Sequence, residues 1–366
     1  MEFTSFSGRK RTLAGNTARK AEFNEIPTIS LTAPQGQVIA QLQDACTRDH
    51  GVPQHAIDGV FATARRFFDQ DLELKTAVHY KKSAILRGYE PIAEVMTDET
   101  KKADLNEAFN CGYEPELDTQ RPDGAQAVDS SLDSAMQGSN AWPSQAGFKT
   151  GVAAYYGQVL ALARRLMRLF ASALELPTDF FDSVVTQPGA MLRLLKYPAQ
   201  DPSRSDALGI GAHTDIECFT ILAQGTQPAL QILNVDGHWI QAPPVPGTFV
   251  VNIGGELSRL IADKTLTLMP YRLVDMLARW SNDKFISTVH RVLNITGEER
   301  YSVPFFFGPS YDTILRPLRT CVGEGTEAKY EPVKAGDYVY QRLTKSRLSK
   351  EEAETKSLLA SGVAAA

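Results

Sequence analysis

The chain has 366 residues, of which 43% are hydrophobic, and it carries a net charge of −5 at pH 7. This length suffices for a large core in one big domain or two closely packed ones, and the weakly acidic balance gives no general attraction to nucleic acid or anionic membranes. No apolar run reaches the roughly 18–20 residues that a membrane span needs. The four cysteines show no paired spacing, which favours free thiols in a reducing compartment. We expect a cytoplasmic protein that is a monomer or a weak homodimer.

Residues 1–25 mix basic side chains with Ser and Thr and show neither a secretory apolar core nor a clear amphipathic stripe. We predict a disordered tail, with an organelle-targeting segment as the alternative. Residues 26–145 are predicted to form an N-terminal region of helices and loops. It begins with a strand at 26–31, followed by helices at 37–48 and 56–70, the second of which has one apolar stripe.

The rest of this region is rich in turns. Residues 82–118 are polar, and residues 120–138, rich in Asp, Ser, Gly and Pro, indicate an exposed loop. A long helix is predicted at 148–176, because its apolar residues recur at helical spacing and Pro177 ends it. We assign this helix a supporting role.

From residue 190 onward the pattern changes to short strands separated by turns, which is typical of a jelly roll. The predicted fold class is therefore α+β. It has a double-stranded β-helix (jelly-roll) core, flanking N-terminal helices and the long supporting helix. We place the catalytic jelly-roll region at 146–343 and a C-terminal helix or tail at 344–366.

A candidate metal site begins at Gly211-Ala212-His213-Thr214-Asp215. Residues two apart in a strand point to the same face, so His213 and Asp215 project together if this segment is a strand and its turn. His290, on a later predicted strand, would complete two imidazoles and one carboxylate, the facial arrangement of non-haem Fe(II) oxygenases. Zinc hydrolases use similar ligands, but the chain has no His-Glu-x-x-His helix. A lone His-x-Asp is more often a strand end beside a turn-capping aspartate.

Arg300 and Ser302 repeat the spacing of two residues shortly after His290. A guanidinium can hold a carboxylate with two hydrogen bonds, and the Ser hydroxyl adds a third. Alone, Arg300 would be interpreted as a solvated turn charge. The ordered combination of the three metal ligands with Arg-x-Ser instead favours an iron site beside a socket for a dicarboxylate.

In this order, the motifs resemble those of iron(II)/2-oxoglutarate-dependent oxygenases of the isopenicillin N synthase-like group, most similar to its fungal members. The resemblance covers residues 26–343. Beyond the ligands, it rests on collinear flanking motifs: Ile26-Pro27, His50-Gly51-Val52-Pro53, Arg87-Gly88-Tyr89, Asn140-Ala141-Trp142-Pro143, Arg193-Leu194-Leu195-Lys196-Tyr197-Pro198 and Trp280-Ser281-Asn282-Asp283.

The resemblance implies a set of site residues and cosubstrates. Fe(II) would be held by His213, Asp215 and His290, and the far carboxylate of 2-oxoglutarate by Arg300, Ser302 and Tyr197. With O2 as the other cosubstrate and ascorbate as a supporting reductant, the enzyme would hydroxylate, desaturate or cyclise a small organic metabolite and release succinate and carbon dioxide. Fungal relatives often serve secondary-metabolite pathways.

Three further residues are candidate substrate contacts by the same resemblance. Phe306 would form an aromatic wall, and Arg87 and Tyr89 lie in a segment that covers the active-site mouth in relatives. Plain packing is the alternative for each of them. The position of Leu195 is often an Asn that contacts 2-oxoglutarate in relatives, a role that leucine cannot take.

The chain departs from the family pattern in two places. The family's Gly-Phe-Phe strand has no counterpart, because Cys46 and the three residues after it run directly into the His50-Gly51 turn. Residues 255–274, twenty residues, interrupt a join that is continuous in relatives. We expect this insert to bulge outward as a surface loop, since loop insertions cost little closure entropy. A partial duplication and a retained intron are the alternatives.

Two other functions stay open at this point. One is an oxidase like isopenicillin N synthase, which keeps the ligands and Arg-x-Ser but takes its electrons from the substrate. The other is a non-catalytic protein, either disrupted by the insert or used as a binding module. We expect a small-molecule substrate and no nucleic acid or membrane partner.

Overall fold

The structure is a computed structural model that describes residues 13–15, 17–20, 49–97, 103–121, 136, 138–201, 208–234, 236–252, 276–283, 285, 288–323, 325 and 327–348, together with the backbone of 2–4, 10–12, 28–30, 45–48 and 253. The expected insert at 255–274, most of the expected loop at 120–138 and most of the C-terminal segment at 344–366 lie outside the described residues.

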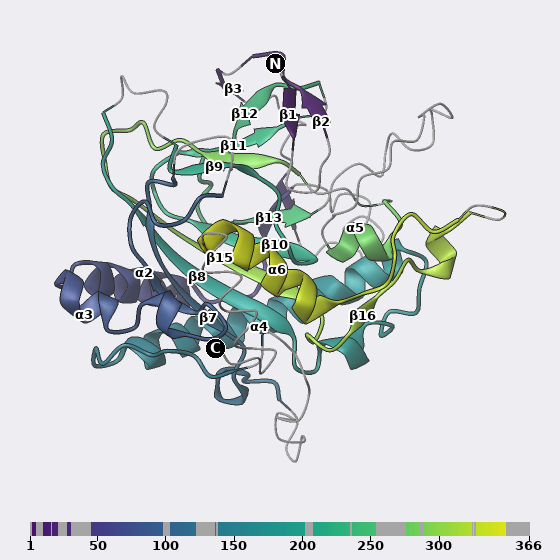
Figure 1. Ribbon diagram of the computed structural model, residues 1–366, viewed down its shortest axis with the longest axis horizontal. Coiled ribbons are helices and arrows are strands. Elements are labelled where there is room, and N and C mark those ends of the chain that lie inside the picture. Colours follow the sequence, from purple (N-terminus) through teal and green to yellow (C-terminus); the bar gives the residue numbers. More distant parts are fainter. Residues whose placement is uncertain are drawn as a thin grey trace, which may run out of the picture.

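Two mainly antiparallel sheets form the core (Figure 1). In the described part of the chain, the larger sheet has eight strands: β4 (Thr28–Ser30), β5 (Ala45–Arg48), β13 (Phe249–Ile253), β10 (Phe219–Gln224), β15 (Arg300–Gly308), β8 (Gly189–Tyr197), β7 (Glu107–Gly112) and β6 (Gly88–Glu90). The smaller sheet has five: β3 (Arg19–Lys20), β12 (Trp239–Gln241), β11 (Leu230–Leu233), β14 (His290–Val292) and β9 (Ile210–His213). Two short pairs complete the strands: β1 (Glu2–Thr4) with β2 (Lys10–Thr12), and β16 (Ile314–Leu315) with β17 (Val333–Lys334). The predicted jelly-roll class is confirmed.

The long helix α4 (Phe148–Ala173) supports the larger sheet, as its apolar stripe predicts. The Tyr156 hydroxyl donates to the Ala190 carbonyl at 2.9 Å, and its ring meets the Phe305 ring edge-on at 5.2 Å between centroids. Phe170 likewise meets Phe219 at 5.1 Å. These contacts tie the helix to β8, β15 and β10, three strands that line the central cavity.

Shorter helices surround this core. The remaining helices are α2 (Gln54–Phe68), α3 (Leu72–Thr76), α5 (Met276–Trp280) and α6 (Ala335–Arg347), with 3-10 turns η1 (Tyr80–Lys82), η2 (Pro115–Leu117), η3 (Asp182–Val185) and η4 (Arg319–Cys321). Helix α2 packs on α4 and buries Val60, Ala64 and Phe67, one stripe of the predicted amphipathic helix. In the described part of the chain, none of the helices is long and apolar enough to cross a membrane.

The structure differs from two expectations about the N-terminal region. Residues 45–48, expected at the end of a helix, form strand β5, which pairs with β13 and with β4. Within the expected disordered tail, β3 pairs with β12, and Leu13 and Ala18 pack against a cluster that includes Trp239. An unpaired sheet edge offers backbone hydrogen bonds that a polar segment can take.

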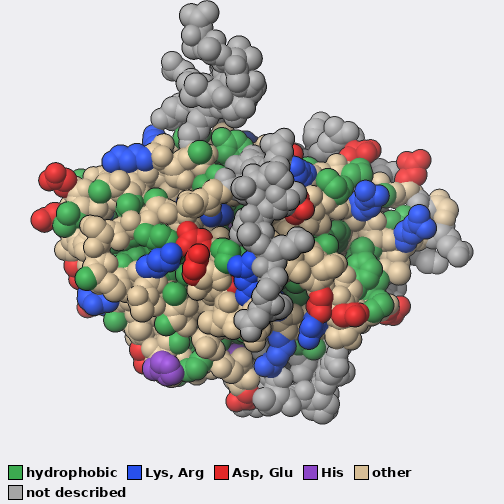
Figure 2. Space-filling view, turned by 90° about the horizontal axis from the view of Figure 1, so that it is seen from below, with side chains coloured by type: hydrophobic (Ala, Val, Ile, Leu, Met, Phe, Trp, Pro, Cys, Tyr) green, Lys and Arg blue, Asp and Glu red, His purple; other side chains and the backbone are tan. Residues whose placement is uncertain are grey.

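Acidic and basic side chains are intermingled on the face of the molecule shown in Figure 2. Over the described residues of that face they form no large patch of one sign. This distribution agrees with the small net charge of −5.

Candidate active site

A cavity of about 150 Å³ lies between the two sheets. Strand alternation explains much of its lining, because side chains two residues apart share a face. From β8 the lining residues are Met191, Arg193, Leu195 and Tyr197, and from β15 they are Arg300, Ser302, Pro304 and Phe306. This is the inward face of β15 that alternation predicts. Strands β9, β11 and β14 form the opposite wall, and α6 closes one side.

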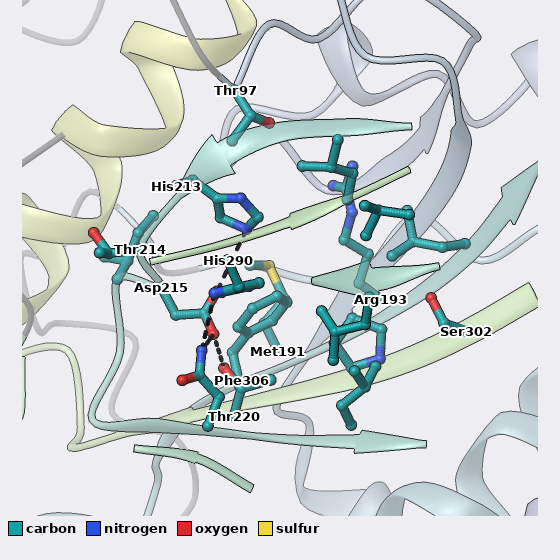
Figure 3. A pocket seen from close by; sticks show the side chains of 18 of the residues that line it. Thr97, Met191, Arg193, His213, Thr214, Asp215, Thr220, His290, Ser302 and Phe306 are labelled. Atoms are coloured by element: carbon teal, nitrogen blue, oxygen red, sulfur yellow. Dashed lines mark hydrogen bonds and ion pairs between the residues drawn. The ribbon is translucent and has the colours of Figure 1, made fainter. Parts of the chain in front are cut away.

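His213, Asp215 and His290 meet in this cavity (Figure 3). Strands β9 and β14 are antiparallel neighbours that place His213 directly opposite His290, with ring centroids 4.2 Å apart. Asp215, just beyond the end of β9, brings Oδ1 to 3.8 Å from Nε2 of His213 and 3.7 Å from Nε2 of His290. In the described part of the chain, this is the only group of at least three His, Cys, Asp or Glu side chains whose ligand atoms converge within 4.8 Å.

Hydrogen bonds fix the imidazoles in the form that binds a metal. Nδ1 of His213 lies 2.8 Å from the Gly211 carbonyl, and Nδ1 of His290 lies 3.2 Å from the Thr288 carbonyl. Because a carbonyl only accepts, Nδ1 of His213 carries the proton and its Nε2 keeps the lone pair for a metal ion. Nδ1 of His290 also lies 3.2 Å from Nδ2 of Asn252. Burial, helped by the nearby His290, lowers the pKa of His213 to about 3, so its ring is neutral at neutral pH.

The second oxygen of Asp215 is held by two donors. Oδ2 accepts hydrogen bonds from Thr220 Oγ1 at 2.6 Å and from Asn252 Nδ2 at 2.8 Å. Burial alone would raise the pKa of Asp215, but His290, His213 and these two donors hold it below its usual value. The carboxylate is therefore ionised, with Oδ1 directed toward the histidines. Two imidazoles and one carboxylate on one side of a point are the donor set of a mononuclear Fe(II) site with open positions.

Arg300 lies on the wall of the same cavity and is 1% exposed. Its Nη1 donates to Ser302 Oγ at 3.3 Å, and its guanidinium lies 4.7 Å from the centre of the Tyr197 ring. Its buried Nε has no hydrogen-bond partner, and among the described residues the side chain forms no ion pair with an acid. A buried guanidinium without a counter-ion is costly. The three predicted carboxylate contacts thus form one cluster around Arg300 that fits an anionic group.

The other predicted contacts divide between two places. Phe306 lines the cavity, whereas Arg87 and Tyr89 do not. The Arg87 guanidinium donates to the Gly138 carbonyl and to Asn140 Oδ1, both at 3.2 Å. The Tyr89 hydroxyl donates to Glu107 Oε2 at 2.7 Å. Both side chains pack the segment onto the barrel, which was the alternative interpretation.

Three contributors to the site were missed from the sequence. Arg193 lies four residues before Tyr197 on β8, so the alternation that placed Tyr197 and Leu195 inside could have revealed it. Asn252 and Thr220, which hold Asp215, also line the cavity, but neither residue was assigned a role from the sequence. Only the pairing of β10 with β13 brings the two residues together, directly opposite each other.

Two family models match the chain. The 2OG-Fe(II) oxygenase superfamily model matches residues 188–309, which contain the metal site and Arg300. The model of the non-haem dioxygenase in morphine synthesis N-terminal region matches residues 26–145. The catalytic and N-terminal regions therefore resemble two parts of the same enzyme class.

Curated relatives agree over most of the chain. It is 35% identical over 358 residues to the 2-oxoglutarate-Fe(II) type oxidoreductase ppzC of Metarhizium rileyi, a match that covers 91% of this chain and 90% of that protein. It is 30% identical over 321 residues to the 2-oxoglutarate-Fe(II) type oxidoreductase hxnY of Emericella nidulans, with 84% of each chain covered.

Solved structures extend the agreement to three dimensions. A full-length Neurospora crassa protein, solved in complex with alpha-KG and 5-formyluracil, matches with a TM-score of 0.68 and 25% identity, covering 88% of this chain and 96% of that one. A putative 2OG-Fe(II) oxygenase family protein from Caulobacter crescentus matches with a TM-score of 0.69 and 29% identity, covering 88% and 99%. The chain therefore belongs to the 2OG-Fe(II) oxygenase superfamily and is a non-haem iron, 2-oxoglutarate-dependent dioxygenase.

Proposed function

We propose that His213, Asp215 and His290 hold Fe(II), and that Arg300, Ser302 and Tyr197 hold the far carboxylate of 2-oxoglutarate. The observation that carries this assignment is the buried guanidinium of Arg300, which shares the cavity with the three ligands. Its hydrogen bond to Ser302 and its position over the Tyr197 ring prepare it for one anionic ligand.

Within this assignment, the chain's own residues orient and shield the reactants. Bound Fe(II) and 2-oxoglutarate, together with O2, supply the oxidising chemistry, and succinate and carbon dioxide are released. The Gly211 carbonyl holds the imidazole proton of His213 on Nδ1, away from the metal, and Nδ1 of His290 contacts the Thr288 carbonyl and the Asn252 side chain. Apolar side chains such as Leu195, Leu222 and Phe306 line the cavity and limit the access of water to the reacting C–H bond.

The substrate that fits this cavity is a small organic metabolite, which the enzyme hydroxylates, desaturates or cyclises. A cavity of about 150 Å³ with mostly apolar walls supports this size class. We propose further that the protein acts in the cytoplasm as a monomer or weak homodimer, without a nucleic-acid partner. In the described part of the chain, Cys111 and Cys321 are buried free thiols, which agrees with a reducing compartment.

The same proposal divides the chain by role. Residues 26–145 form the N-terminal region of the fold and residues 146–343 the catalytic region. Residues 1–25 and 344–366 flank these regions, and their described parts pack on the core, because β3 pairs with β12 and α6 extends to Arg347. The insert at 255–274 belongs to the catalytic region. The match of separate family models to 26–145 and 188–309 supports a boundary between the two central regions.

Anaerobic titration of the purified apoprotein, first with Fe(II) and then with 2-oxoglutarate, tests the site assignment. We expect the weak visible charge-transfer band of the chelate to appear in the wild type. It should be lost in His213→Ala, which removes a metal ligand, and weakened at a given 2-oxoglutarate concentration in Arg300→Ala. Arg168→Ala is the matched control, because Arg168 is exposed and pairs with Asp182 away from the cavity.

Two results would contradict the assignment in different ways. Fe(II) binding without the band, followed by turnover that does not require 2-oxoglutarate, would favour an oxidase like isopenicillin N synthase. Absence of metal binding in a folded protein would favour the non-catalytic alternative. A band that survives in Arg300→Ala with unchanged affinity would reject Arg300 as the carboxylate contact.

A further inference from the structure

A second group of buried charges lies on the cavity wall, apart from Arg300. Glu90, which is 1% exposed, sits between two arginines. Its Oε2 lies 2.6 Å from Nη1 of Arg193, and its Oε1 accepts a hydrogen bond from Nε of Arg347 at 2.5 Å. Asn110 adds a hydrogen bond from Nδ2 to Oε1 at 2.8 Å. Strands β6 and β8 and helix α6 are joined at this point.

The charges of this trio do not balance. Two guanidinium groups share one carboxylate, and the exposed fractions of Arg193 and Arg347 are only 7% and 8%. Burial would raise the pKa of Glu90, but the two guanidinium groups hold it below its usual value, so Glu90 is ionised and the trio carries one excess positive charge. The nearby carboxyl of Asp104 interacts electrostatically with Arg193, but its oxygens accept from Gly211 and Thr97. A buried excess charge is costly unless an anion neutralises it.

The donors of both arginines reach the cavity. Arg193 and Arg347 both line it, and Figure 3 shows the Arg193 side chain extending into the space that His213 borders. Both contacts of Arg193 with described residues use Nη1, to Glu90 and to Asn110 Oδ1 at 3.1 Å. Its Nη2 and Nε therefore stay available within the described structure. Arg347 uses Nε for Glu90 and Nη1 for Ser346 Oγ at 3.3 Å, so its Nη2 has no partner among the described residues.

This basic cluster is distinct from the Arg300 socket. Arg193 precedes Tyr197 by four residues on β8, which separates the two positions by roughly 13 Å along the strand. One 2-oxoglutarate carboxylate held at Arg300 therefore leaves the Arg193–Arg347 cluster for another anion. Met191 and Leu195 flank Arg193 on the cavity face of β8, and Ile210 lines the same cavity.

We propose that the organic substrate is a small carboxylic acid, whose carboxylate binds Arg193 and Arg347 and whose apolar body lies against Met191, Leu195 and Ile210. This inference rests on the proposed function, because it assigns the substrate of the same site. Glu90 is a positioning residue that holds the two guanidinium groups side by side. A carboxylate fits the single excess charge of the trio and the planar donor edges of the guanidinium groups.

Matched probes that differ only in the anionic group test the proposal. The full-length protein, loaded anaerobically with Fe(II) and 2-oxoglutarate, is titrated with 3-phenylpropionate and 3-phenylpropionamide and with octanoate and octanamide at constant ionic strength. Binding is measured from the shift in the midpoint temperature of thermal unfolding and from the change in the charge-transfer band. We expect each acid to bind at least tenfold more tightly than its amide.

Variants assign the difference to the cluster. Arg347→Gln and Arg193→Gln should each bind the acids at least tenfold more weakly than wild type and bind the amides unchanged. The affinity of Arg347→Lys for the acids should lie between those of wild type and Arg347→Gln. Arg168→Gln removes an exposed guanidinium and should change neither affinity. Arg347→Gln is expected to fold, because Arg193 remains paired with Glu90 and the Arg347 carbonyl still accepts from Tyr80.

Several outcomes would overturn the inference. The inference fails if the amides bind with the same affinity as the acids, or if the acids bind Arg347→Gln and Arg193→Gln with unchanged affinity. It also fails if neither of the two acids binds the wild type. Octyl phosphate binding more tightly than octanoate would replace the carboxylate by a phosphate. If the charge-transfer band never forms, the proposed function fails, while the thermal midpoints still decide whether the cluster binds organic acids.

Discussion

The backbone amide of Gly211 donates a hydrogen bond of 2.9 Å to Oδ1 of Asp104, and this bond supports the strand that carries His213. The carbonyl of the same Gly211 accepts from Nδ1 of His213 at 2.8 Å. The other oxygen of Asp104 accepts from the amide of Thr97 at 3.1 Å and from its hydroxyl. One buried carboxylate thus connects the segment before β7, the cavity residue Thr97 and the metal-binding strand.

Asp104 makes the stability of the protein depend on pH. Burial raises its pKa to about 6, against the opposing effect of its hydrogen bonds. Because the folded-state pKa lies above the unfolded one, the stabilisation is complete below the unfolded pKa and is lost as pH rises through about 6. The difference in unfolding free energy between wild type and Asp104→Asn should therefore fall by about 1 to 1.5 kcal/mol from pH 5 to pH 7.5. Urea denaturation of both proteins at both pH values measures it, and parallel pH profiles would contradict it.

Asn252 and Thr220 should control iron affinity through Asp215. Each donates to Oδ2, which leaves Oδ1 directed toward the histidines. Because such supporting hydrogen bonds orient the ligand, Asn252→Ala and Thr220→Val should each weaken Fe(II) binding by about 10- to 100-fold. Anaerobic Fe(II) titration measures the change. Thr220→Ser keeps the hydroxyl and should stay near wild type; an equal loss in that variant would point to packing instead.

Gly209 leaves the space that the Tyr197 ring occupies. A Cβ at position 209 would lie 2.7 Å from Cδ1 of Tyr197 and 3.2 Å from Cγ1 of Val292. Gly209→Ala should shift the ring and raise the dissociation constant of 2-oxoglutarate by about tenfold, the scale of a mild overpacking cost. Fe(II) affinity should change little.

The control for this prediction is Gly59→Ala in helix α2. A Cβ there meets nothing within 4 Å, and the substitution should stabilise the protein by about 0.5–1 kcal/mol. Titration of 2-oxoglutarate into each Fe(II)-loaded variant compares them. Unchanged 2-oxoglutarate affinity in Gly209→Ala would argue against Tyr197 as a contact.

Removal of the acid between the two arginines should destabilise the fold. Glu90→Gln leaves Arg193 and Arg347 close together without a counter-ion, and breaking such a buried pair costs about 3–5 kcal/mol. Chemical denaturation measures this loss. The double variant Glu90→Gln with Arg347→Gln removes one of the two charges and should recover at least half of it, whereas additive losses would show that the charges do not interact.

The sequence by itself determined those parts of the site that depend on local periodicity. The spacing of His213 and Asp215, and the alternation of Arg300, Ser302, Pro304 and Phe306, follow from the two-residue repeat of a strand, and all six residues line one cavity. The jelly-roll class followed in the same way from short strands with turns and from the resemblance of collinear motifs.

Tertiary structure alone decided the contacts between distant segments. Glu90 and Arg347 are 257 residues apart in the chain, and Asp104 and Gly211 are 107 apart, so no local pattern relates them. The same holds for β5, where a segment with a helical pattern instead pairs with β13. Arg87, a motif residue, lies just before β6, contacts Gly138 and Asn140, and does not line the cavity. Local periodicity fixes which face a side chain takes, but a buried charge or an open sheet edge is satisfied by whichever partner the folded chain brings to it.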